Sequence, residues 1–188
     1  MKRALLLLSL FGLFIINVGA QNKFTADTTK TKLLWFGDKV TGQHTGTINL
    51  QSGWLIWQSN KIVSGEFIID MKSLKDAGND NNLEGHLKSD EFFGVAKFPT
   101  AKIVVTGSTQ FDKGTGVVSG TLTIKDVTNP VEFKAVMQKK DEGVWFFANI
   151  DVDRTKYNIR YGSGSFFDNL GDKTINDEFK LKVNLLVK

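Results

Sequence analysis

Several stretches of this chain alternate apolar and polar residues with a period of two. The segment 118–125 is typical, because apolar Val118, Leu122 and Ile124 alternate with Ser, Thr and Lys residues. Successive side chains of a β-strand point to opposite faces, so each such stretch would form a strand with one apolar face. The pattern recurs in the segments 65–72, 101–106, 131–138, 146–153 and 179–188, and more weakly in 33–36 and 45–50. It predicts about eight antiparallel strands.

Turn-forming residues separate these stretches. Asp112-Lys113-Gly114 and Asp141-Glu142-Gly143 are predicted hairpin tips. The sequence Thr128-Asn129-Pro130 predicts a turn before the next strand, because proline restricts the residue that precedes it. Eight such strands fit a closed barrel, whose interior is filled by side chains or by one small ligand. The chain also combines 18 Gly with 11% aromatic residues, which suggests strands that turn tightly around something bulky.

One segment, 79–95, has a helical rather than a strand pattern. Leu83 and Leu87 are four residues apart and would share one helical face. Asp80 or Asn81 can cap the start of this helix. A helix between two barrel strands commonly plugs one end of the barrel. A second irregular segment, 154–177, is rich in Gly, Asn and aromatic residues.

The N-terminus has the pattern of an export signal. Lys2 and Arg3 precede an apolar run, 4–16, and small residues lead up to Ala20. This arrangement predicts a signal peptide of residues 1–20, cleaved after Ala20, and one domain of residues 21–188. A membrane anchor is the alternative, but a span needs about 20 apolar residues. We therefore expect a bacterial periplasmic or secreted protein without stable membrane insertion.

Charge and composition exclude several classes of function. Without Lys2 and Arg3 the formal net charge falls from +4 to +2, which removes the main support for nucleic-acid binding. The absence of Cys excludes disulfides, thiolate metal sites and Cys nucleophiles. No nucleophile-elbow, zincin, P-loop or dinucleotide motif is present. We predict no catalytic residue, metal site or cofactor; an enzyme that uses His44 or His86 is the alternative.

The remaining polar and aromatic residues point to a cavity mouth. Arg154 and Arg160 could bind a polar ligand head, although such residues more often pair with a nearby carboxylate. The pairs Phe92-Phe93 and Phe166-Phe167 fall in irregular segments, where core packing explains them less well. Paired aromatics at a barrel mouth could line an apolar slot or lid.

Three ordered segments resemble the YceI-like family of polyisoprenoid-binding periplasmic proteins. The first is His86–Phe93 (HLKSDEFF), followed by 96–101 (AKFPTA). The second, 120–131 (GTLTIKDVTNPV), resembles the family pattern G-x-L-T-x-x-G-V-T-x-P-V. The third, 153–159 (DRTKYNI), resembles R-x-x-[FY]-x-[IL]. Two departures stand out: Asp126 replaces the usual Gly, and Lys39 falls roughly where many members carry His.

The resemblance implies a lipocalin-like, eight-stranded antiparallel β-barrel with a short helix capping one end. It also implies non-catalytic binding of a long isoprenoid, quinone or fatty-chain ligand in an apolar lumen, for transport, storage or stress protection. Head-group contacts are then expected from His86, Arg154 and Arg160. The expected lipid-lining residues are Trp35, Phe67, Ile69, Leu83, Leu87, Phe92, Phe93, Phe98, Ile103, Val105, Leu122, Ile124, Phe133, Ile159, Phe166 and Phe167.

Other classes remain open at this point. A small outer-membrane barrel has a similar size, but the faces opposite the apolar stripes carry Lys, Glu, Asp and Thr. A structural or adhesion domain would contain the same strands without a ligand. An exposed sheet edge would also allow a homodimer.

Overall fold

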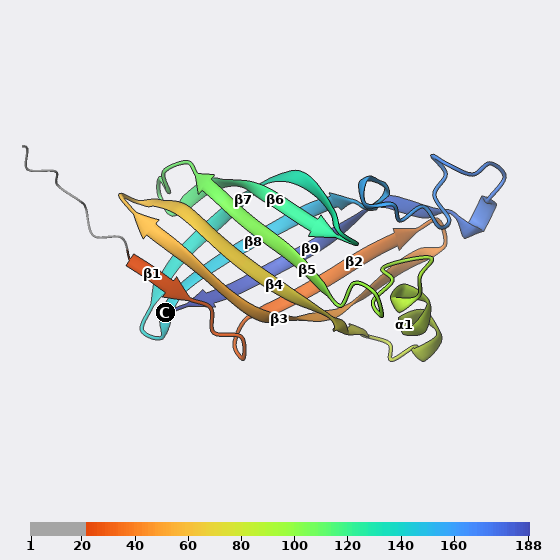
Figure 1. Cartoon of the computed structure of the whole chain (residues 1–188), viewed down its shortest axis with the longest axis horizontal. Coiled ribbons are helices and arrows are strands. Elements are labelled where there is room, and N and C mark those ends of the chain that lie inside the picture. The colour runs from red at the N-terminus through yellow and green to blue at the C-terminus, as the bar shows by residue number, and fades with distance from the viewer. Residues whose placement is uncertain (1–21) are drawn as a thin grey trace, which may run out of the picture.

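The computed structural model describes residues 22–188, so the predicted signal segment 1–20 lies outside the described residues. Within this range the chain is almost entirely β-structure (Figure 1). None of the helices in the described range is long and apolar enough to span a membrane. The strands are β1 (Asn22–Thr25), β2 (Lys32–Lys39), β3 (Gly42–Gln58), β4 (Lys61–Asp76), β5 (Thr100–Ser108), β6 (Thr115–Ile124), β7 (Val127–Lys140), β8 (Gly143–Asp153) and β9 (Ile175–Val187).

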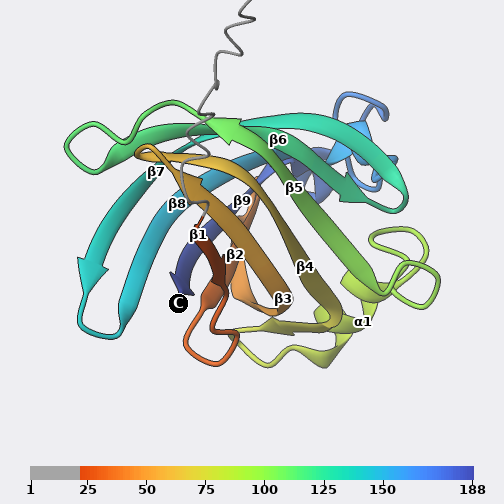
Figure 2. The same ribbon diagram turned by 60° about the vertical axis from the view of Figure 1, so that its left-hand side comes forward.

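The strands β2 to β9 form a closed antiparallel barrel. Neighbours in the sheet follow the order β1-β3-β2-β9-β8-β7-β6-β5-β4, and a further β3–β4 pairing closes the ring (Figure 2). The short β1 adds a ninth strand by pairing with the end of β3, from Asn22 opposite Trp57 to Thr25 opposite Trp54. The predicted eight-stranded barrel is therefore confirmed.

Two of the predicted turns are confirmed and one is wrong. The tips at 112–114 and 141–143 lie between β5 and β6 and between β7 and β8. The predicted turn at 128–130 is instead part of β7, where Pro130 lies opposite Thr121. The chain reverses earlier, at Lys125 and Asp126, whose φ angles are 50° and 59°. A two-residue hairpin turn with both central residues at positive φ matches the twist of its flanking strands.

The helix α1 (Asn81–Lys88) covers one end of the barrel, beside the end of β4 (Figure 1). Asp80 is its N-cap, because its carboxylate accepts hydrogen bonds from the backbone N–H groups of Asn82 and Leu83. Glu84 is buried and accepts hydrogen bonds from Lys75 Nζ and from the Asp76 N–H. These bonds fix α1 against β4. Two short 3₁₀ helices, η1 (Arg154–Tyr157) and η2 (Gly171–Lys173), interrupt the loop before β9.

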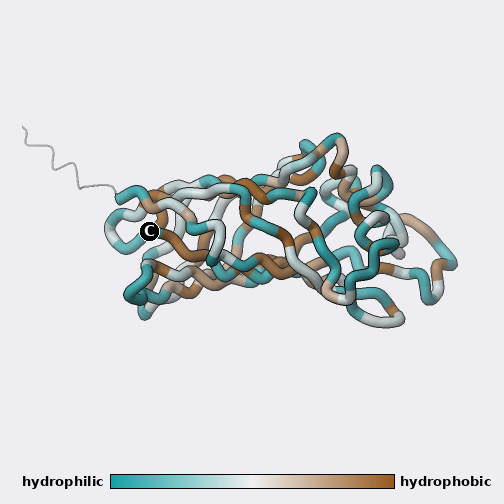
Figure 3. The backbone as a smooth tube through the Cα atoms, turned by 90° about the horizontal axis from the view of Figure 1, so that it is seen from below, coloured by the Kyte–Doolittle hydropathy of each residue, from teal (hydrophilic) through white to brown (hydrophobic). Residues whose placement is uncertain are grey.

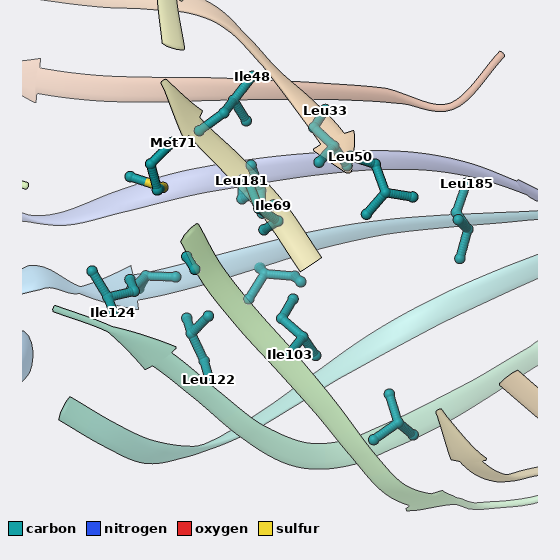
Figure 4. Close-up of a cluster of buried hydrophobic side chains, with 14 of the residues drawn as sticks. Leu33, Ile48, Leu50, Ile69, Met71, Ile103, Leu122, Ile124, Leu181 and Leu185 are labelled. Atoms are coloured by element: carbon teal, nitrogen blue, oxygen red, sulfur yellow. The ribbon is translucent and has the colours of Figure 1, made fainter. Parts of the chain in front are cut away.

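The core lies inside the barrel. The hydropathy of the chain alternates along the strands (Figure 3), as expected when only one face of each strand is buried. Figure 4 shows part of the buried apolar cluster that fills the barrel. The labelled members are Leu33, Ile48, Leu50, Ile69, Met71, Ile103, Leu122, Ile124, Leu181 and Leu185.

Candidate functional site

An apolar cavity of about 100 Å³ lies inside the barrel at the α1 end; we call it the inner cavity. Its walls come from the inward faces of the strands and from the segment of α1 and the turns after it. Arg154, Asn176 and Glu178 are the polar residues that border it. Eight residues predicted from the sequence line it: Trp35, Ile69, Leu87, Phe92, Phe93, Ile103, Leu122 and Ile124.

A smaller cavity of about 60 Å³, the mid-barrel cavity, continues toward the opposite end. It shares Ile69, Ile103, Ile150 and Leu181 with the inner cavity, so the two adjoin. Phe67, Val105 and Phe133, which were also predicted from the sequence, line this second space together with Thr31, Leu33, Leu50, Val183 and Leu185.

The inner cavity adjoins a larger hollow of about 580 Å³ at the α1 end, which we call the vestibule. Trp35, Gly37, Leu87, Phe92 and Ile175 line both spaces. The vestibule has more ionisable residues in its wall than the inner cavity: Asp38, Lys39, His44, His86, Asp172 and Lys173. Leu83 and Phe167 line it as well. An apolar tunnel with a polar mouth is the arrangement that suits an amphiphile.

His86 has an unusual environment in the vestibule. Its ring lies edge-on to the ring of Tyr161, with centroids 4.4 Å apart, and 5.8 Å from that of Phe92. Its Nε2 atom is buried and has no hydrogen-bond partner among the described residues. A buried polar atom normally has a partner, so this nitrogen is suited to a polar group of a ligand.

Arg154, predicted as a head-group contact, directs its donors at the protein itself. Nε donates to the carbonyl of Asn176, Nη1 to those of Ile159 and Tyr161, and Nη2 to that of Ile175. Its side chain is 1% exposed, and burial lowers the pKa of the guanidinium while Asp177 and Asp153 act in the opposite direction. Arg154 therefore fixes the loop that forms the vestibule wall.

Four other predicted site residues lie away from the cavities. Phe98 packs beside Gly94, and Ile159 is fully buried in the loop before β9. The guanidinium of Arg160 lies 4.5 Å from the ring centroid of Phe166, which is 45% exposed. None of these four residues lines the inner cavity, the mid-barrel cavity or the vestibule.

Some lining residues were missed by the sequence reasoning. Phe179 and Leu181 belong to the alternating pattern of β9, so a period-two signal for them was present. Tyr161, Leu170 and Lys173 line the vestibule from an irregular loop that has no such period. Within residues 22–188, no group of three or more His, Asp or Glu side chains is arranged to hold a metal ion.

Comparison with known proteins decides the family. The family model described as "YceI-like domain" matches residues 24–187. This chain belongs to the YceI-like family. The resemblance of the three sequence segments is thereby confirmed.

Relatives with determined sequences agree with this assignment. A UPF0312 protein of Pseudomonas putida (strain W619) is 32% identical over 100 residues, which are 53% of this chain and 52% of the relative. A UPF0312 protein of Shewanella denitrificans is 31% identical over 102 residues, with the same shares. The chain thus spans about half the length of the curated relatives that it matches.

Solved structures share the fold of this YceI-like chain. BcnA of Burkholderia cenocepacia superposes with a TM-score of 0.71 at 21% identity, covering 87% of this chain and 99% of BcnA. A polyisoprenoid binding domain from Saccharophagus degradans, implicated in plant cell wall breakdown, gives 0.65 at 15% identity, covering 88% and 97%. A YCEI protein of Campylobacter jejuni gives 0.57 at 17% identity, covering 81% and 84%.

The departure noted at Lys39 falls in the site. Lys39 lines the vestibule together with His86 and Phe92.

Proposed function

We propose that this YceI-like chain binds a long-chain isoprenoid or similar amphiphile without catalysing a reaction on it. The apolar tail would occupy the inner and mid-barrel cavities, and the polar end would remain in the vestibule. The observation that carries the proposal is the contact between a cavity lined almost wholly by apolar side chains and a vestibule with charged walls.

The energetics of such binding need few polar contacts. Each buried CH₂ group contributes about 0.8 kcal/mol, so a chain of prenyl units gains affinity from burial alone. The vestibule, at about 580 Å³, falls in the usual range of ligand sites, roughly 300–1,000 Å³. The Saccharophagus degradans domain, which shares the fold, is described as polyisoprenoid binding, and this supports the same ligand class here. Quinones and fatty chains have the same combination of tail and polar end.

The surroundings of the two histidines favour binding over catalysis. His86 contacts aromatic rings, and its Nε2 atom has no carboxylate or hydroxyl partner among the described residues. A general base normally has a partner that orients it and a nucleophile within reach. His44 lies in the vestibule wall, but no cluster of acidic residues or histidines of metal-binding size accompanies it in residues 22–188.

We also propose that the protein acts after export, in the periplasm or outside the cell, where it would transport or store lipid or protect against stress. The basis is the N-terminal sequence, with Lys2, Arg3 and the apolar run before Ala20. We propose in addition that two copies of the chain can associate as a homodimer.

The decisive experiment is native purification followed by mass spectrometry of the extracted lipids. We expect an isoprenoid, quinone or fatty-chain lipid near one per protein molecule. The matched variants are Ala101→Phe, which fills the inner cavity, and Val104→Phe, which enlarges a half-buried residue of the opposite face of β5. The first should lose the lipid and the second should retain it. A protein that carries no lipid and is not stabilised by added isoprenoids or quinones would contradict the proposal.

A further inference from the structure

The wall of the barrel is incompletely paired between β7 and β8. Their pairing runs from Lys140 opposite Gly143 to Ala135 opposite Ala148 and ends there. Beyond this point each strand pairs on one side only within the part of the chain that the structure describes. Residues 127–134 of β7 pair with β6, and residues 149–153 of β8 pair with β9. We call the unpaired line between these two segments the seam.

The seam has a defined end on each side. Toward the hairpin near the C-terminus (Figure 1) it ends at the Ala135–Ala148 pair. Toward the α1 end it is bridged by Asn129, whose Nδ2 donates to the carbonyl of Lys156 in η1 over 3.0 Å. Residues 130–134 of β7 and 149–153 of β8 therefore remain between the two bridges.

Pro130 lies inside the seam and helps to explain why it stays open. Opposite Thr121, it is three pairs from the Ile124–Val127 pair that closes the two-residue turn. Hydrogen-bonded and non-hydrogen-bonded pairs alternate along an antiparallel ladder, so the nitrogen of Pro130 faces β8 rather than β6. Proline has no N–H to donate there, and the strand cannot complete its pairing at this position.

The space behind the seam is apolar. Phe133 of β7 and Ile150 of β8 both line the mid-barrel cavity, and the register of β7 and β8, if continued, would set them opposite each other. Ile150 is 2% exposed, whereas Phe133 is only half-buried. Phe133 is thus a side chain that borders both the seam and the mid-barrel cavity.

Aromatic side chains also narrow both ends of the lumen, although at the α1 end the inner cavity adjoins the vestibule. Phe92 and Phe93 pack together at the α1 end, with centroids 5.0 Å apart. At the opposite end Trp57, Phe111 and Phe146 form a cluster with centroid separations of 5.2 to 6.0 Å. A tail that entered past the Trp57 cluster would have to displace several packed rings, whereas one that entered through the seam would have to move Phe133.

We propose that the seam is a side entrance through which the apolar tail of the ligand enters and leaves the barrel, with Phe133 as its gate. This proposal rests on the proposed lipid binding. The ligand class is set by the apolar character of Phe133, Ile150 and the cavity behind them.

The first test closes the seam with a disulfide. Because the chain has no Cys, the double variant Lys134→Cys/Asn149→Cys places a single cross-link one pair beyond the end of the ladder. Val136→Cys/Phe147→Cys, within the paired region, is the control. Oxidation of the first pair should slow the exchange of retinol, a fluorescent isoprenoid alcohol, by about tenfold, and reduction should restore it. A cross-linked seam with unchanged exchange would overturn the proposal.

The second test changes the gate. Phe133→Ala should speed retinol release about tenfold more than Phe67→Ala does. Phe67 is a matched control because it is also half-buried and lines the same mid-barrel cavity, but from a strand paired on both sides. If the two variants release retinol equally fast, the effect reflects only the lost contact area with retinol, and this result would count against a gate.

The third test needs no lipid and separates the two proposals. Single cysteines at Ile150 and Ile103 both face the mid-barrel cavity, but only Ile150 borders the seam. An apolar maleimide should label Ile150→Cys about tenfold faster than Ile103→Cys. Equal labelling rates would overturn the side entrance. If labelling favours Ile150→Cys but the natural chain binds neither retinol nor native lipid, the entrance stands and the proposed function fails.

Discussion

The Nη2 atom of Arg154 lies 3.6 Å from Oδ1 of Asp177 and so connects the start of η1 to β9. The same guanidinium donates to four backbone carbonyls, and two of these, of Ile159 and Tyr161, belong to the loop between η1 and β9. A loop carbonyl that is buried needs a donor. One side chain therefore supplies donors to two carbonyls of the irregular loop and to two of β9, and it ties the vestibule wall to the sheet.

Replacement of Arg154 by Met should destabilise the protein strongly. Removal of one partner from a buried ionic network costs about 3–5 kcal/mol, because the other groups stay buried without donors. Urea unfolding followed by circular dichroism measures the loss. Arg160→Met is the matched control, since Arg160 only stacks on the exposed Phe166, and it should cost about 1 kcal/mol or less. Similar losses for the two variants would mean that the Arg154 network contributes little.

Stability should fall in acid through carboxylates whose pKa is lowered in the folded state. Hydrogen bonds from Lys188 and Thr29 hold the pKa of Asp27 well below its ordinary value of 3.8. For Asp177, burial acts to raise the pKa, but hydrogen bonds from Ser163 and Ser165 and the charge of Arg154 leave it lowered. A lowered folded-state pKa gives stability that is present above the unfolded value and is lost as the pH falls through the folded one.

We therefore expect the unfolding midpoint to be steady from pH 7 to about 5 and to decline below about 4. The measurement is urea unfolding at a series of pH values. Asp27→Asn should flatten this decline, whereas Asp141→Asn should not, because Asp141 lies in a hairpin turn and forms no ion pair within the described residues. An acid limb that is identical in Asp27→Asn and the natural chain would contradict the assignment.

The sequence predicted the strands well wherever one face of a strand is buried without interruption. The segments 146–153 and 179–188 correspond closely to β8 and β9, because a period of two follows directly from alternate burial. In β3 the prediction stopped at Leu50, and the reason is physical. The buried positions are Ile48, Leu50, Gly53 and Leu55. The spacing is therefore three residues, not two, between Leu50 and Gly53, where the β3–β4 pairing is irregular. A bulge of this kind breaks the period of two on which the prediction depends.

The site divides in the same way. The walls of the inner cavity follow from the strand pattern, as for Leu122 and Ile124. The loop wall of the vestibule does not, because a residue such as Tyr161 is positioned by the hydrogen bonds of Arg154 to the loop and to β9. Local sequence patterns carry no information on contacts of that range, so for this loop only the presence of aromatic residues near a mouth could be inferred.

His86→Phe should separate the packing role of this residue from its role toward a ligand. Phe keeps the ring contacts with Tyr161 and Phe92 and removes the buried Nε2 atom that has no partner. We expect stability to stay equal or to rise by about 1 kcal/mol, while retinol affinity falls about tenfold through loss of one hydrogen bond. Fluorescence titration and thermal unfolding measure the two effects. His44→Phe, in the same vestibule, is the control; a clear loss of stability in His86→Phe would show that Nε2 is already satisfied within the protein.

The turn between β6 and β7 offers a stabilising substitution. Asp126 has a φ of 59°, a conformation that L-residues adopt at a cost, smaller for Asn and Asp than for the others, and that Gly adopts freely. Gly is also the residue that the YceI-like pattern places here. Because Gly gains freedom in the unfolded chain as well, we expect Asp126→Gly to raise the free energy of unfolding by only about 0.5 kcal/mol.

The neighbouring Lys125 should be left unchanged in that experiment. Its Nζ donates to the carbonyls of Asp90 and Phe92 and thereby ties the hairpin to the segment that closes the α1 end of the lumen. Asp126→Val supplies the opposite test, since a β-branched residue at positive φ is strained, and it should destabilise the protein in urea unfolding by more than Asp126→Gly stabilises it. If Val is tolerated as well as Gly, the turn does not keep its left-handed conformation in solution, and the hairpin that borders the seam is formed in another way.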